Sequence, residues 1–143
     1  MTIARMVAGR EPQQVVHCQP HETVRDAAER LAERRIGAMP VLNQGEVAGI
    51  FSERDLLYCI ARHGADALDI RIGDVMTAPP ITVDPSTAVL DALELMTRRR
   101  IRHLPVLEND RLVAFVSIGD LVKYRIEAIE NEAAAMRDYI RTA

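Results

Sequence analysis

Two short motifs, GIFSERD at 49–55 and AFVSIGD at 114–120, each place an aspartate three residues after a serine. A serine at the start of a helix can bond the free N–H groups of the first turn, and an aspartate there is favoured by the helix dipole. The same N–H groups can bind a phosphate or a ribose, and an aspartate can accept bonds from both ribose hydroxyls. Each motif therefore fits a helix cap, a nucleotide site, or both.

Both motifs belong to a longer internal repeat. Pro20 and Pro85 stand at matching places, 85 − 20 = 65 residues apart, and the match continues without a gap. The same offset relates these pairs: Val24 and Val89, Asp26 and Asp91, Ala27 and Ala92, Glu29 and Glu94, 34–36 and 99–101, 40–42 and 105–107, Ser52 and Ser117, Asp55 and Asp120, Leu56 and Leu121. The chain is therefore two copies of one unit, since a solenoid would need three or more.

Each copy predicts the order β-α-β-β-α, which makes the fold class α/β. The expected segments are a short strand, an amphipathic helix, two strands joined by a tight turn, and a helix that opens at the serine. The strands are expected at 15–16, 40–42 and 47–51, and again at 81–83, 104–107 and 112–116. Thr23 and Asp26 have the spacing of a capping box. Helices packed on a sheet would bury these apolar faces.

The repeats set the expected boundaries along the chain. Repeat 1 covers 8–63, a linker covers 64–72, and repeat 2 covers 73–128. Apolar residues recur near helical spacing from Leu121 to the end, so one long helix is expected there, with 129–143 as an extension beyond the repeat. Such an extension exceeds what the unit needs, and it is expected to pack against a neighbour.

The combined motifs resemble the CBS domain, the repeat first named in cystathionine β-synthase. The resemblance rests on the Ser-x-x-Asp motifs, on AMPV at 38–41 and HLPV at 103–106, and on DVMT at 74–77 ahead of PPITV at 79–83. It covers about residues 8–128. It implies two repeats related by a pseudo-two-fold axis, two clefts between them, and an adenosine-containing ligand.

The resemblance also assigns residues to the two clefts. Cleft A would be formed by Ile50, Ser52, Arg54, Asp55, Pro80, Ile81, Ile101, Arg102 and His103. Cleft B would be formed by Gln14, Val16, Gly37, Ala38, Phe115, Ser117, Gly119 and Asp120.

The two clefts differ in charge and in width. Cleft A adds Arg54, Arg102 and His103 as phosphate partners, although each can equally be a solvated surface charge. Gly49 would let a flat base approach the backbone in cleft A, whereas Ala114 stands at the matching place in cleft B. We therefore expect cleft A to bind more tightly.

Composition excludes several other classes of function. A net charge of -3 and an aromatic content of 3% disfavour nucleic-acid binding. No apolar run could cross a bilayer, and the first residues lack the apolar core of a signal peptide, so a cytoplasmic protein without membrane contact is expected. The segment His17-Cys18-x-x-His21 has metal-like spacing, but alternation would point neighbouring ligands apart, so no metal site is expected. No catalytic motif is present, and no enzyme activity is expected.

The sequence thus predicts a regulatory module that catalyses nothing and requires no cofactor. The resemblance implies an adenine nucleotide as regulatory ligand: AMP, ADP or ATP first, then NAD(H) or S-adenosylmethionine. It also implies a homodimer, and an unidentified protein as the target of the signal. The alternatives are a ligand-free dimeric scaffold that acts through its surface and C-terminal helix, and a small enzyme with an unrecognised site.

Overall fold

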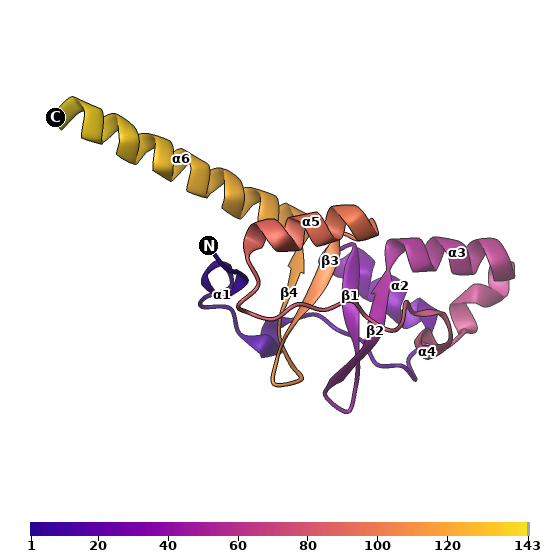
Figure 1. Cartoon of the computed structure of the whole chain (residues 1–143). Helices are drawn as coiled ribbons and strands as arrows, with labels where there is room; N and C mark the ends of the chain where they lie inside the picture. The colour runs from indigo at the N-terminus through magenta and orange to yellow at the C-terminus, as the bar shows by residue number, and fades with distance from the viewer. Residues whose placement is uncertain (143) are drawn as a thin grey trace.

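The computed structural model describes residues 1–142, so Ala143, the last residue of the expected terminal helix, lies outside the description. The elements, with η for a 3₁₀ helix, follow in this order: α1 (Ile3–Met6), η1 (Pro12–Gln14), α2 (Val24–Arg34), β1 (Ala38–Asn43), β2 (Glu46–Ser52), α3 (Glu53–His63), η2 (Gly64–Asp69), α4 (Ile72–Val75), α5 (Val89–Arg99), β3 (His103–Glu108), β4 (Arg111–Ser117) and α6 (Ile118–Thr142). Figure 1 shows the two hairpins side by side, with α6 projecting from the body.

The two hairpins confirm the central part of each predicted repeat. β1 pairs antiparallel with β2, and β3 pairs antiparallel with β4, each with a register shift at the matching place. The turn residues Gln44 and Gly45, and Asn109 and Asp110, all have positive φ angles. Tight hairpin turns need such angles because their twist then matches the twist of the strands.

The predicted first strand of each repeat was wrong in extent. Instead of strands at 15–16 and 81–83, the structure has single parallel bridges, from Cys18 to Val41 and from Val83 to Val106. Cys18 donates its N–H to the carbonyl of Pro40 at 3.1 Å. The next bond of a parallel ladder would need an N–H from Pro40, which proline lacks, so the pairing stops. Pro105 ends the second bridge in the same way.

Helix starts follow the predicted capping boxes. Thr23 Oγ1 accepts from the N–H of Asp26 at 3.2 Å, and the Asp26 carboxylate accepts from the N–H of Thr23 at 3.1 Å. Ser52 and Asp55 make the same reciprocal pair at the start of α3. Each pair satisfies two N–H groups that would otherwise have no partner in the helix.

Each repeat is completed by the segment that precedes the other repeat. Ile3 donates its N–H to the carbonyl of Thr87 at 2.9 Å, and Ile72 donates to the carbonyl of Glu22 at 2.9 Å. The two acceptors differ by 87 − 22 = 65 residues, which is the offset of the repeat. Both isoleucines are fully buried, Ile3 in the core of repeat 2 and Ile72 in the core of repeat 1. These two equivalent contacts, related by the pseudo-two-fold axis, hold the two repeats together.

The long C-terminal helix was predicted and is present as α6, with 25 residues. Leu121, in its first turn, is fully buried in the core of repeat 2, whereas 130–142 are exposed. Within residues 1–142, no helix combines the length and the apolar character needed to span a bilayer.

Candidate functional site

An open cavity of about 420 Å³ lies between the two repeats. Its walls come from the N-terminal part of repeat 1, from the end of α2 with the start of β1, and from β3, β4 and the start of α6. The lining residues are Val15, Val16, Arg35, Ile36, Gly37, Ala38, His103, Phe115, Ser117 and Asp120. The cavity therefore brings together six of the eight residues predicted for cleft B. Of the other two, Gln14 lines an adjoining cavity of about 160 Å³, and Gly119 is not among the lining residues.

Ser117 and Asp120 stand at the wall of this cavity and cap α6. The N–H of Ser117 donates to Asp120 Oδ2 at 2.9 Å, and the N–H of Asp120 donates to Ser117 Oγ at 3.0 Å. The guanidinium of Arg10 lies 3.6 Å from the same Oδ2. Among the described residues, no hydrogen bond reaches Asp120 Oδ1. Within the described residues, one oxygen of this cavity-lining carboxylate therefore has its acceptor capacity unused.

His103 belongs to this cavity, although it was predicted for cleft A. Its ring stacks on Phe115, with centroids 5.5 Å apart and planes inclined by 12°. Burial lowers the pKa of His103, while the nearby charges of Asp120 and Glu53 oppose that shift and Arg102 adds to it. The imidazole is therefore neutral near pH 7 and extends the flat apolar face of Phe115.

The lowered pKa predicts a pH-dependent stability. A histidine whose pKa falls on folding binds fewer protons in the folded than in the unfolded chain, so its contribution is complete above the unfolded pKa of about 6.5 and decreases as the pH falls below it. The free energy of unfolding, measured with urea from pH 7.5 to 5.0, should fall more steeply for the native chain than for His103→Phe. His63→Phe, at an exposed histidine, is the matched control, and equal slopes for His103→Phe and the native chain would contradict the assignment.

Arg35 is a cavity residue that the sequence did not point out. It ends α2 in the left-handed conformation, with φ 53° and ψ 47°, which is unusual for a residue other than glycine or asparagine. Arg35 lines the cavity together with the two residues that follow it, Ile36 and Gly37. A guanidinium at this place can bind an anionic group of a ligand. Arg10 was also missed, because it precedes the part of the chain where the repeat is readable.

The cleft A residues make a different set of contacts. Asp55 accepts bonds from the N–H and the hydroxyl of Ser52, both at 2.9 Å to Oδ2, and from the hydroxyl of Thr77 at 2.8 Å to Oδ1. Arg54 reaches across to repeat 2 and donates to the carbonyl of Arg100 at 3.5 Å. Both oxygens of the Asp55 carboxylate are therefore already engaged by the chain itself.

The other predicted cleft A residues are spread over repeat 2 and β2. Ile81 and Ile101 pack on the core of repeat 2, Pro80 and Ile50 are half-buried, and the side chain of Arg102 is exposed. Ile50 is bridged to Thr77 through two backbone hydrogen bonds, of 3.0 and 2.9 Å. The segment at Thr77, near the start of repeat 2, thus pairs with the part of β2 that the sequence assigned to a ligand.

The structure explains why residue 49 is a glycine, and the explanation differs from the predicted one. A Cβ atom built at Gly49 would lie 2.7 Å from the carbonyl oxygen of Thr77 and 2.8 Å from the sulfur of Met76. Real Cβ atoms do not approach other atoms this closely, so the glycine is needed for Met76 and Thr77 to pack on β2. The prediction that Gly49 opens the backbone to a flat base is therefore replaced by a packing role.

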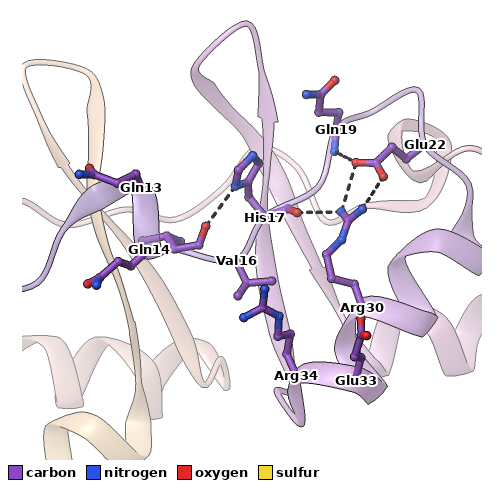
Figure 2. A pocket seen from close by; sticks show the side chains of 10 residues that line it. Gln13, Gln14, Val16, His17, Gln19, Glu22, Arg30, Glu33 and Arg34 are labelled. Carbon is purple, nitrogen blue, oxygen red and sulfur yellow. Dashed lines mark hydrogen bonds and ion pairs between the residues drawn. The ribbon is translucent and has the colours of Figure 1, made fainter.

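A larger hollow, of about 650 Å³, lies on the outer side of repeat 1 and is strongly polar. Figure 2 shows that the side chains around it come from η1, from the following segment and from α2. Its most central cation, Arg30, is engaged by the chain: Nη2 lies 2.7 Å from Glu22 Oε2, and Nη1 donates to the carbonyl of His17 at 2.8 Å. This ion pair lowers the pKa of Glu22. Most of its lining is polar, with Val15 and Val16 as the apolar members, and Arg30 is already paired, so the hollow is a weaker candidate than the cleft.

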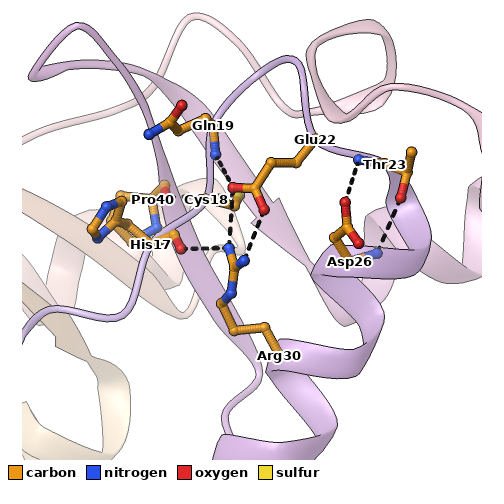
Figure 3. Close-up of polar contacts among 8 residues, drawn as sticks. All are labelled: His17, Cys18, Gln19, Glu22, Thr23, Asp26, Arg30 and Pro40. Carbon is orange, nitrogen blue, oxygen red and sulfur yellow. Dashed lines mark hydrogen bonds and ion pairs between the residues drawn. The ribbon is translucent and has the colours of Figure 1, made fainter.

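Two of the three residues with metal-like spacing, His17 and Cys18, make their contacts in different places. Figure 3 shows Cys18 directed inward behind Pro40, and the fully buried thiol lies 3.9 Å from the Pro40 carbonyl. His17 instead shares a hydrogen bond with the carbonyl of Val15 at 3.1 Å. Burial raises the pKa of the Cys18 thiol to about 12, so the thiolate that a metal requires is disfavoured.

Comparison with known proteins identifies the repeats. A model of the CBS domain matches residues 12–62 and 72–127. The chain is 38% identical over 129 residues to the mitochondrial CBS domain-containing protein CBSX3 of Arabidopsis thaliana, a match that covers 87% of this chain and 63% of that protein. It is 31% identical over 121 residues to YhcV, a CBS domain-containing protein of Bacillus subtilis, covering 85% of this chain and 84% of that protein.

Solved structures support the same conclusion. The CBS-domain protein ATU1752 of Agrobacterium tumefaciens superposes with a TM-score of 0.80 at 35% identity, over 87% of this chain and 92% of that one. CBSX2, whose structure was solved in complex with AMP, superposes with a TM-score of 0.76 at 26% identity, over 89% of this chain and 97% of that one. Since the family model matches most of the chain, repeat by repeat, the protein belongs to the CBS-domain family and is a CBS pair.

Proposed function

We propose that this CBS pair is a regulatory module that binds an adenosine-containing nucleotide in cleft B, the cavity lined by Phe115 and Asp120. The observation that carries the proposal is the Oδ1 of Asp120, which no hydrogen bond reaches among the described residues, in a cavity of about 420 Å³ that Phe115 also lines. That volume is within the usual range of small-molecule sites. A related CBS pair, CBSX2, has been solved in complex with AMP.

Each part of such a ligand has a matching surface in the cavity. Phe115 and Val16 offer apolar contact to an adenine base, and Gly37 and Ala38 leave room for it. The carboxylate of Asp120 can accept bonds from the ribose hydroxyls, which is a charge-assisted and therefore strong contact. Arg35, which lines the cavity, and Arg10, beside Asp120, supply positive charge for a phosphate.

The choice of cleft B reverses the order of affinity expected from sequence. Cleft A was favoured for its basic residues, yet both oxygens of Asp55 accept bonds from Ser52 and Thr77. A ribose there would have to displace the Thr77 hydroxyl. In cleft B the matching aspartate is paired only through Oδ2 within the described residues, so binding disrupts fewer contacts.

Thermal unfolding with added nucleotide tests the proposal. AMP at about 100 times its Kd should stabilise the protein by roughly 2.7 kcal/mol, which is about 5–10 °C in Tm for a domain of this size. ADP, ATP, NAD(H) and S-adenosylmethionine are compared in the same assay, with CMP as a control that keeps the ribose and phosphate. Equal shifts with CMP and AMP would contradict adenine recognition, and no shift with any of them would favour the ligand-free scaffold.

Signalling follows if the nucleotide changes the way the two repeats meet. The cavity wall combines residues of repeat 1 with residues of repeat 2, so a ligand that bridges them favours the arrangement in which it makes both contacts. Four properties stay predictions from the sequence: the absence of turnover, the cytoplasmic location, the homodimer, and a separate protein that receives the signal. Recovery of unchanged AMP after prolonged incubation would support a module without catalysis.

A further inference from the structure

The C-terminal helix α6 carries an apolar stripe that the rest of the chain does not cover. Its large members are 42–67% exposed. The residues on the stripe alternate at spacings of four and three: Val122, Ile126, Ile129, Ala133, Met136 and Ile140. Leu121 and Tyr124, which pack on the core of repeat 2, lie on another side of the helix. The stripe is therefore directed away from the helix's own domain, and Figure 1 shows the helix extending beyond it.

The spacing is that of a coiled-coil seam. With Ile126, Ala133 and Ile140 at a positions, the d positions are Val122, Ile129 and Met136. Apolar residues at a and d repeat every 3.5 residues on average, and such a narrow seam packs against another helix with the same repeat. A helix facing a globular core would carry a wider apolar face. A second copy of this chain supplies a helix with the matching repeat.

Charges beside the seam determine the direction of the partner helix. The g positions include Arg125 and Glu132, and the e positions include Glu130 and Arg137. In a parallel pair, each g residue faces the e residue of the next heptad on the other helix. Arg125 then faces Glu130 of the second copy, and Glu132 faces Arg137 of the second copy. Both contacts are attractive, and the two-fold symmetry makes each of them twice.

An antiparallel pair would place like charges together. There, e positions face e positions, and full overlap of the apolar layers centres the pair on Asn131. Glu130 would then face Glu130 of the second copy, and Lys123 would face Arg137. Like charges at these flanking positions disfavour this orientation.

We propose that α6 forms a parallel, two-stranded coiled coil with α6 of a second copy, along residues 122–140. The two domains would then lie at the same end of the coiled coil, with the free ends of α6 together at the other end. This inference does not depend on the nucleotide, and its test needs none.

Disulfide trapping tests the orientation. In Met136→Cys, the parallel pair brings the two new thiols to one layer of the seam, so mild oxidation should give a covalent dimer. An antiparallel pair would separate them by roughly 15 Å along the axis, beyond the reach of a disulfide. Asp138→Cys, at an f position on the outer side of the same turn, is the matched control and should stay uncrosslinked. The native Cys18 and Cys59 are buried, and the unsubstituted chain controls for them.

A charge-reversal series tests the pairing. By sedimentation equilibrium, Glu132→Arg should raise the Kd of the dimer roughly tenfold, because two attractive contacts become repulsive. Adding Arg137→Glu should restore it, since the pair is then attractive with its signs exchanged. Three results would overturn the proposal: absence of the Met136→Cys crosslink, a dimer Kd that does not change with these substitutions, or an assembly whose mass corresponds to three or more chains.

Discussion

Replacing Ile3 with alanine is expected to destabilise the protein by about 2–5 kcal/mol, the usual cost of removing most of a buried isoleucine side chain. Ile3 is fully buried in the core of repeat 2, although it lies at the opposite end of the sequence from that repeat. Its N–H also donates to the carbonyl of Thr87, which holds the short helix α1 in place. A residue near the N-terminus would ordinarily tolerate substitution. A loss of this size would therefore indicate that the N-terminal segment packs in the core of repeat 2.

Urea unfolding at neutral pH measures this effect. Ile72→Ala should cost a similar amount, since Ile72 makes the equivalent contact in repeat 1. Arg5→Ala, at an exposed residue of the same short helix, should change the free energy of unfolding by less than about 0.5 kcal/mol. If Ile3→Ala were as mild as Arg5→Ala, the N-terminal segment would not be part of the core of repeat 2.

Replacing Asp120 with alanine is expected to weaken AMP binding by about 3 kcal/mol, which is roughly a hundredfold in Kd. The proposed ribose contact is charge-assisted, and its loss also leaves Arg10 without its partner beside the ligand. Titration calorimetry with AMP at constant salt gives the Kd directly.

The matched control for this substitution is Asp55→Ala. Both aspartates close a capping box, at the start of α6 and of α3, so both variants lose a helix cap worth about 1 kcal/mol. Only Asp120→Ala removes the proposed ligand contact in cleft B. A loss of AMP affinity in Asp55→Ala with none in Asp120→Ala would place the nucleotide in cleft A and overturn the assignment.

Local features of the fold were predicted well from the sequence. The capping boxes at Thr23 and Ser52 involve residues three apart, and the hairpin turns involve neighbouring residues, so residue type and spacing are sufficient to predict them. The first strand of each repeat was overestimated, because its pairing depends on whether the facing residue has an N–H. Pro40 and Pro105 end that pairing, and this is visible only once the register is known.

The membership of the candidate site was predicted in part. The motif residues Phe115, Ser117 and Asp120 line one cavity together with Gly37 and Ala38, as the resemblance implied. Arg10 stands in no motif, and Arg35 lies in the repeated stretch 34–36 but was assigned to neither cleft, so both were missed. Arg35 could have been noticed only as a cation at a helix end, where a left-handed conformation is common.

By itself, the sequence determined that there are two copies of one unit, where their helices and hairpins start, and which family they resemble. These properties depend on contacts between residues that are close along the chain or matched by the repeat. The tertiary structure decided that His103 stacks on Phe115, that Gly49 accommodates Met76 and Thr77, and that Ile3 completes the core of repeat 2. Each of these depends on which distant segment packs against a residue, and residue type and local spacing do not determine that.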